Sequence, residues 1–249
     1  MDLRFINFFN LRTLLVVAIS QIAVFLAIQF QIKFNINVML FGLAVVFPLH
    51  FSIQSAYQRR ERAIQYFSKF KAAMVSLYNS MQVAPDLTVE IKTEGRDLLQ
   101  DIAEQFTTKL TNREPGYQPV LQNLNRITIF ISTHKKDLSN RNAIRMITFL
   151  NIATESSIYL VQIISHRTMA GLRFFAIFFV MVFPFVQAPI LLDRLDGLLP
   201  HWLLHLIVGL TSIVLVSLSN FQKMIEYPFD QAGLDNIQLK EFEPGIQTL

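Results

Sequence analysis

Four long apolar stretches, none of which contains Asp, Glu, Lys or Arg, constrain this chain more than any other feature. They occupy residues 14–30, 36–53, 174–192 and 202–219. A helix that crosses a lipid bilayer needs about 20 mostly apolar residues, so each stretch is long enough or nearly so. The composition agrees, because only 16% of the residues are charged, whereas soluble domains carry about 25%. The sequence therefore predicts an all-α polytopic membrane protein with four transmembrane helices.

The first stretch has an alternative interpretation as a cleaved signal peptide, since Ala18 and Ser20 resemble the small residues of a cleavage site. The apolar run, however, continues about ten residues beyond them, which is longer than a signal peptide requires. We therefore expect this stretch to be retained as the first span.

The basic residues are distributed unevenly among the segments that connect the four stretches. The first connection carries only Lys33 and the third only Arg194, whereas Arg59, Arg60 and Arg62 directly follow the second stretch. Lys and Arg next to membrane spans are retained on the cytoplasmic side. We therefore predict that the large middle segment and both termini are cytoplasmic, with membrane lipids around the spans. The absence of cysteine and the short outer loops suit a bacterial inner (plasma) membrane.

The middle segment has the three- and four-residue apolar spacing of helices throughout. The second span continues without a break signal to about residue 81, and only Pro48 is expected to kink this helix. Further helices are expected at residues 86–111, 120–133 and 139–166, with Ser139 as an N-cap. The tail after Tyr227 is turn-rich and expected to be extended. The predicted organisation has four parts: residues 1–53 (an N-terminal amphipathic segment and spans one and two), 54–172 (cytoplasmic helices), 173–222 (spans three and four) and 223–249 (a cytoplasmic tail).

The sequence contains little that indicates covalent chemistry. The absence of cysteine excludes thiol catalysis and zinc–thiolate sites, and no glycine-rich phosphate-binding motif is present. His201 and His205 lie one helical turn apart, a spacing that a metal pair uses, but no third ligand is near in sequence. We favour an interfacial histidine pair, beside Trp202 at the membrane boundary. We therefore predict no enzyme activity, no metal or other cofactor, and no nucleic-acid partner.

One stripe on the second span stands out for a possible function. Leu43, Phe47 and Phe51 recur every four residues, and Gln54 and Gln58 continue the line toward the cytosol. Such a stripe is apolar within the membrane and lined by amides below it, which suits a pore but also ordinary helix packing. His50 lies beside it, and an ionisable group inside a membrane either faces water or snorkels to the interface. Residue patterns alone do not decide whether the stripe lines a pore or packs against a helix, or whether His50 faces water or snorkels.

Three segments resemble the bestrophin family of pentameric ion channels. Residues 55–63, "SAYQRRERA", resemble the segment that follows the family's second span. Phe183, Pro184 and Phe185 resemble a motif at the end of the family's third span. The tail resembles the family's Pro-Phe signature, with the matching residues Glu226, Pro228, Phe229 and Asp235.

This resemblance implies a homo-pentameric channel that passively conducts chloride or related monovalent anions. Counting back from Arg59, which matches the family's arginine, the three residues of the hydrophobic neck fall on Leu43, Phe47 and Phe51. His50, Gln54, Gln58 and Arg59 are then candidates for flanking or gating the pore, and we hypothesise that protonation of His50 tunes gating. The basic residues 59–62 favour anions if they face the vestibule; the alternative is that ion pairs with Glu61 or neighbouring subunits occupy them.

The chain also departs from the family pattern. Arg60 and Glu61 replace two tryptophans of the family. After Phe229 only Asp230 and Asp235 remain of the acidic run that binds calcium in animal members, so we predict no calcium activation by that route. A cation-conducting member of the same family, and a membrane-anchored scaffold or sensor whose cytoplasmic helices bind a partner, are the two alternative functions.

Overall fold

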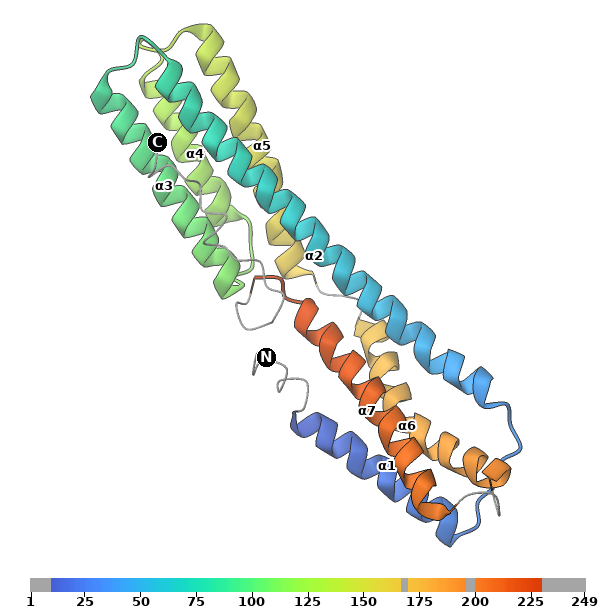
Figure 1. Ribbon diagram of the computed structural model, residues 1–249. Coiled ribbons are helices and arrows are strands. Elements are labelled where there is room, and N and C mark those ends of the chain that lie inside the picture. The colour runs from blue at the N-terminus through green and yellow to red at the C-terminus, as the bar shows by residue number, and fades with distance from the viewer. Residues whose placement is uncertain (1–9, 167–169, 196–199, 230–249) are drawn as a thin grey trace. The chain divides into compact units, whose positions relative to one another are not determined.

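The structure is a computed structural model that describes residues 10–166, 170–195 and 200–229. All the regular elements in these residues are α-helices, so the predicted all-α class is confirmed for the part of the chain described (Figure 1). In chain order the helices are α1 (Leu11–Gln29), α2 (Val38–Val83), α3 (Val89–Asn112), α4 (Gln118–Thr133), α5 (Asn140–Ser165), α6 (Ala170–Leu195) and α7 (His201–Ile225).

The contacts within the chain define two compact units. The first unit comprises Met1–Gln58 and Thr168–Glu226, and the second unit comprises Arg59–Arg167 and Tyr227–Leu249. The four-part organisation expected from the sequence refers to membrane boundaries and stays a prediction, because the units are defined by packing alone. Asp230 and Asp235 lie outside the described residues.

Five of the described helices, rather than four, are long and apolar enough to cross a membrane by length and composition. Four of them, α1, α2, α6 and α7, cover the four predicted spans except for residue 30 of the first and residues 36–37 of the second. The fifth is α5, which we expected in the cytoplasm. Its buried face, which includes Met146, Leu150 and Leu160, belongs to the apolar core of the second unit. Arg145 and Glu155 are exposed on α5, and charged side chains are costly in lipid.

Small and polar side chains allow α1 to lie close to α7 in the first unit. Ser20, Ala23 and Ala27 are buried on α1, and a Cβ on Gly209 of α7 would lie only 2.9 Å from the Gln21 side-chain nitrogen. Helices in membranes associate through such small residues, because lipid provides no hydrophobic driving force between them. Two apolar clusters complete this packing. One contains Val24, Ala27, Ala188, Leu192, Leu204 and Val208; the other contains Val16, Val45, Leu49, Ala176, Val180, Phe183, Leu215 and Val216.

The helix α2 is 46 residues long, and Pro48 lies inside it. This confirms that one helix continues from the second apolar stretch into the charged segment, two residues later at each end than expected. Its buried side chains include Val45 and Leu49 in the first unit and Phe67, Met74 and Leu77 in the second. The kink at Pro48 stays a prediction.

The second unit consists of α3, α4 and α5 packed with the second half of α2 around one apolar core. Ser139 is the N-cap of α5, as predicted, and its hydroxyl accepts a hydrogen bond from the Asn142 amide at 3.4 Å. The expected start of α3 at residue 86 is wrong, because Thr88 caps the helix and residue 89 is its first. The helix α4, by contrast, begins two residues earlier than expected, because Pro119 is tolerated in its first turn.

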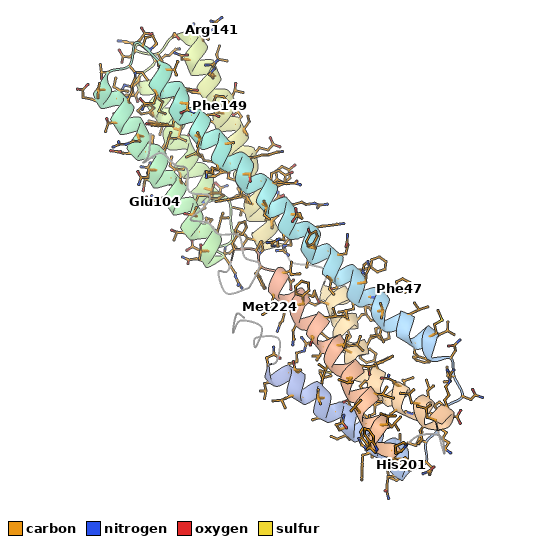
Figure 2. The ribbon with its side chains drawn as sticks, viewed as in Figure 1. Phe47, Glu104, Arg141, Phe149, His201 and Met224 are labelled. Atoms are coloured by element: carbon orange, nitrogen blue, oxygen red, sulfur yellow. The ribbon has the colours of Figure 1, made fainter. Side chains whose placement is uncertain are left out.

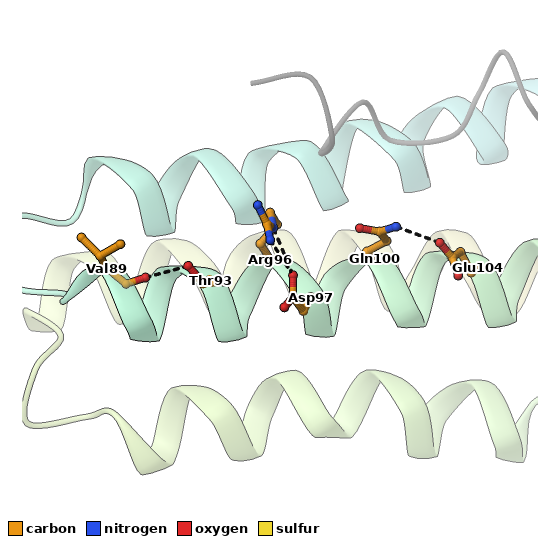
Figure 3. Close-up of polar contacts among 6 residues, drawn as sticks. All are labelled: Val89, Thr93, Arg96, Asp97, Gln100 and Glu104. Atoms are coloured by element: carbon orange, nitrogen blue, oxygen red, sulfur yellow. Dashed lines mark hydrogen bonds and ion pairs between the residues drawn. The ribbon is translucent and has the colours of Figure 1, made fainter.

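The acidic residues of α3 lie on its exposed face, as a solvated helix surface requires. Arg96 donates to Asp97 at 3.0 Å, and Gln100 donates to Glu104 at 2.9 Å (Figure 3). Asp101 accepts hydrogen bonds from Arg126 of α4 at 2.6 Å and from Gln105 at 2.8 Å. The bond from Arg126 is the main cause that holds the pKa of the Asp101 carboxyl below its ordinary value.

Candidate pore-lining face

The predicted stripe on α2 is exposed within the chain. Leu43 is 39%, Phe47 53% and Phe51 57% exposed, and the Phe47 side chain stands out from the ribbon in Figure 2. Each residue of an α-helix turns about 100° from the last, so residues two positions apart lie on nearly opposite sides. The stripe is therefore on the side of α2 opposite Val45 and Leu49, which pack in the first unit.

The aromatic side chains of this face are arranged in a row along the helix. The Phe47 and Phe51 rings are stacked, with centroids 6.3 Å apart and planes inclined by 19°. His50 is exposed and meets Phe51 edge-on, with centroids 6.0 Å apart. Gln54 and Gln58 are exposed one and two turns further along. The single chain thus presents two aromatic rings followed by two amides, with a histidine at the margin.

Arg59 is engaged in a hydrogen bond within the second unit. Its guanidinium donates a hydrogen bond to the Ile163 carbonyl oxygen on α5. The Arg60 Nη1 atom lies 3.8 Å from the Glu61 carboxylate, which is the ion pair considered as the alternative for this segment. Arg62, by contrast, is exposed. The argument for anion preference from residues 59–62 is weaker than the sequence suggested, because two of the three arginines are engaged within the chain.

Three of the four residues of the tail signature, Glu226, Pro228 and Phe229, are described by the structure, and all three are buried. Glu226 is only 1% exposed, and the Arg173 Nη1 atom donates to both of its carboxylate oxygens, at 3.2 Å and 3.4 Å. Pro228 is buried, and the Phe229 ring packs with Phe67 in the second unit, with centroids 6.1 Å apart. Sequence reasoning gave Arg173 no individual role. Nothing in the sequence pairs it with a residue 53 positions later.

His205 makes a polar contact between two helices of the first unit. Its Nδ1 atom lies 2.8 Å from the Gln21 side-chain oxygen on α1, and the Gln21 amide nitrogen donates to the His205 carbonyl at 3.3 Å. His201, one turn earlier, is exposed. Among the described residues, no group of three or more His, Cys, Asp or Glu side chains is placed to hold a metal ion. These contacts give His205 a role in packing α7 against α1.

No protein-family model and no curated protein sequence matches this chain. Its fold is nevertheless similar to that of solved structures, one of which is described as a membrane protein. Three others are described more specifically: all are crystal structures of a bacterial bestrophin homologue from Klebsiella pneumoniae, two of them with a mutation.

For the first of the three, phased with zinc, the TM-score is 0.77 at 16% identity, over 95% of this chain and 94% of the other. One mutant has a TM-score of 0.78 at 15% identity, over 99% of this chain and 96% of the other. The second mutant has a TM-score of 0.76 at 16% identity, over 95% of both chains. The chain therefore has the fold of the bacterial bestrophin homologues, and the resemblance that its motifs indicated is confirmed at the level of the fold.

Proposed function

We propose that this protein is a bestrophin-like channel that conducts monovalent ions passively through a homo-pentameric pore. In this proposal the α2 helices of five subunits surround the axis. The observation that carries it is the exposed stripe of Leu43, Phe47 and Phe51 on a helix whose opposite face is packed within its own subunit. Five copies of such a stripe form stacked apolar rings, and an apolar constriction gates an ion path by dewetting.

Chloride or a related monovalent anion remains the proposed ion. The exposed Arg62 supports it, because a positive charge raises the local concentration of anions. Phenylalanine edges carry the positive end of the ring quadrupole and suit a passing anion. The partly exposed carboxylate of Glu61 acts in the opposite direction, so a cation-conducting member of the same channel class is the second candidate.

The proposed setting is a bacterial inner membrane, crossed by α1, the first half of α2, α6 and α7, with both termini in the cytoplasm. The scarcity of basic residues in the two short connections supports this orientation. In the same proposal the second unit is cytoplasmic, including α5, whose exposed Arg145 and Glu155 would be costly in lipid.

Two measurements on detergent-purified protein test the proposal. Two-dimensional class averages of single particles are expected to show fivefold symmetry, and liposomes containing the protein are expected to pass ions down an imposed gradient. Reversal potentials under chloride and under potassium gradients then separate anion from cation conduction. Monomers or dimers without ion flux would instead favour a membrane-anchored scaffold or sensor.

A further inference from the structure

The ion pair between Arg173 and Glu226 lies within the first unit and joins the beginning of α6 to the end of α7. Glu226 is the C-cap of α7, and its backbone amide donates to the Gln222 carbonyl at 3.1 Å. Its side chain is 1% exposed, whereas that of Arg173 is 27% exposed. A buried carboxylate is costly unless a cation and hydrogen bonds compensate for the lost water, and Arg173 supplies both. The two helix ends are therefore held together at this point.

Within the first unit, α6 and α7 also form an apolar cluster with α2. Ala176 and Val180 follow Arg173 by three and seven residues, which places them on the same side of α6. Both belong to the apolar cluster that contains Val45 and Leu49 of α2. On α7, Leu215 and Val216 belong to the same cluster. The α6–α7 surface and α2 thus meet in one apolar cluster.

The packed face of α2 and its exposed stripe are two sides of one helix. Packed interiors transmit displacement rather than absorb it, because they contain few voids. We propose that Arg173 is a positioning residue: by holding the Glu226 carboxylate it fixes the α6–α7 surface, and thereby the placement of the Leu43, Phe47 and Phe51 face. The consequence for ion passage rests on the proposed channel function, but the consequence for the position of α2 does not.

The absence of cysteine allows this positioning to be measured directly with introduced spin labels. Val46→Cys on α2 and Ile22→Cys on α1 place labels at exposed sites, 51% and 54% exposed, on helices that do not carry the ion pair. Labelled subunits are diluted with unlabelled ones, and electron–electron double resonance gives the distance within one subunit. Arg173→Met and Glu226→Gln are expected to broaden this distance distribution or shift it by about 1–2 Å, the size of typical helix shifts.

The matched control is Arg126→Met, which breaks the ion pair with Asp101 in the second unit and is expected to leave the distance unchanged. Arg173→Lys retains both charges in place, and the exchange Arg173→Glu with Glu226→Arg retains both in reversed positions; these variants are expected to recover the native distance at least in part. They also keep the test decisive if Arg173→Met does not fold. An unchanged distance in folded Arg173→Met and Glu226→Gln overturns the proposal.

Ion flux gives a second measurement, which separates positioning of the neck from general destabilisation. Arg173→Met is expected to alter flux severalfold in native protein but to have little further effect after Phe47→Ala and Phe51→Ala, because the neck it positions is then already wide. Independent effects in the two backgrounds contradict an action through the neck. If the distance changes in Arg173→Met while even the native protein conducts no ions, the proposed channel function fails and the positioning role remains.

Discussion

Phe47 and Phe51 stack one helical turn apart on α2, with ring centroids 6.3 Å apart and both rings more than half exposed. The helix α6 has a pair with closely similar geometry, since Phe174 and Phe178 are also exposed and stacked, with centroids 6.2 Å apart. The two pairs have the same chemistry on different helices. They therefore provide a target and a matched control for the proposed pore.

Replacing Phe47 and Phe51 together by alanine is expected to increase ion flux severalfold. The physical reason is that the two largest apolar side chains of the constriction are shortened, so water and ions enter more easily. The measurement is ion efflux from liposomes that contain equal amounts of folded protein. Phe174→Ala with Phe178→Ala is expected to leave flux near the native rate; an equal increase in both double variants contradicts a neck on α2.

His50 is expected to make flux depend on pH. Its ring is inclined by 63° to the Phe51 ring, with centroids 6.0 Å apart. A cation beside the aromatic stripe changes the local hydration and the field that a passing ion experiences. Flux is measured as a function of pH for native protein and for His50→Ala. The same pH profile in both proteins removes His50 from the gating hypothesis.

The number of membrane spans can be determined by cysteine labelling, because the native sequence contains no cysteine. Single cysteines are introduced at Lys33, Lys136 and Lys223 and treated with a thiol reagent that does not cross the membrane. With four spans and cytoplasmic termini, only the cysteine at position 33 is expected to react in intact cells. If α5 also crosses the membrane, the chain reverses its direction and position 223 becomes reactive from outside as well.

The hydrogen bond between Asp101 and Arg126 is expected to contribute modestly to stability in a pH-dependent way. Because Arg126 lowers the pKa of the Asp101 carboxyl in the folded protein, the contribution is present above the ordinary pKa of Asp. It is lost as the pH falls through the lowered pKa. The pair is about half exposed, so Asp101→Asn should cost at most about 1 kcal/mol at neutral pH. Thermal unfolding at pH 7 and at acidic pH checks this: a difference between Asp101→Asn and native protein that persists at low pH is inconsistent with it.

Gly95→Ala is expected to destabilise the second unit. An added Cβ would lie 2.5 Å from the Met81 sulfur and 3.1 Å from the Phe130 ring, and Met81 is fully buried. Overpacking of this kind costs about 1–3 kcal/mol, against a gain of about 1 kcal/mol in helix propensity. The apparent Tm should therefore fall by up to a few degrees. Gly171→Ala, where nothing lies within 4 Å of the added Cβ, is the control and should not lower Tm.

The periodicity of the sequence predicted most of the helices because it reflects local backbone geometry. Val38–Val83 forms one helix across the change from apolar to charged residues, as expected from the absence of a break signal. The errors in the predicted helices lie at their ends, because a single capping side chain determines where a helix begins. Thr88 caps α3 with a hydroxyl that accepts a hydrogen bond from the Ile91 amide, so the helix begins at residue 89, three residues later than expected.

The candidate pore face was also identified from sequence, since residues four apart share one side of a helix. What surrounds it was not. Arg59 stays a candidate for flanking the pore, and its hydrogen bond to a carbonyl oxygen 104 residues later in the chain was not predicted. Glu226 was identified only through a motif, and its partner Arg173 was not identified at all. Contacts between segments that are far apart in the chain do not produce a regular residue spacing, so they cannot be read from a single sequence.

By itself, the sequence determined that this chain is helical, that it contains long uncharged apolar segments, and which residues share the stripe on α2. These properties follow from the 3.6-residue repeat of the α-helix and from the free-energy cost of placing a charged side chain in lipid. Both depend only on the residues within one segment. Only the tertiary structure decided which face of α2 is buried, where Arg59 points and what neutralises the Glu226 carboxylate. These features depend on the packing between helices, and the sequence of one helix does not specify which other helix packs against it.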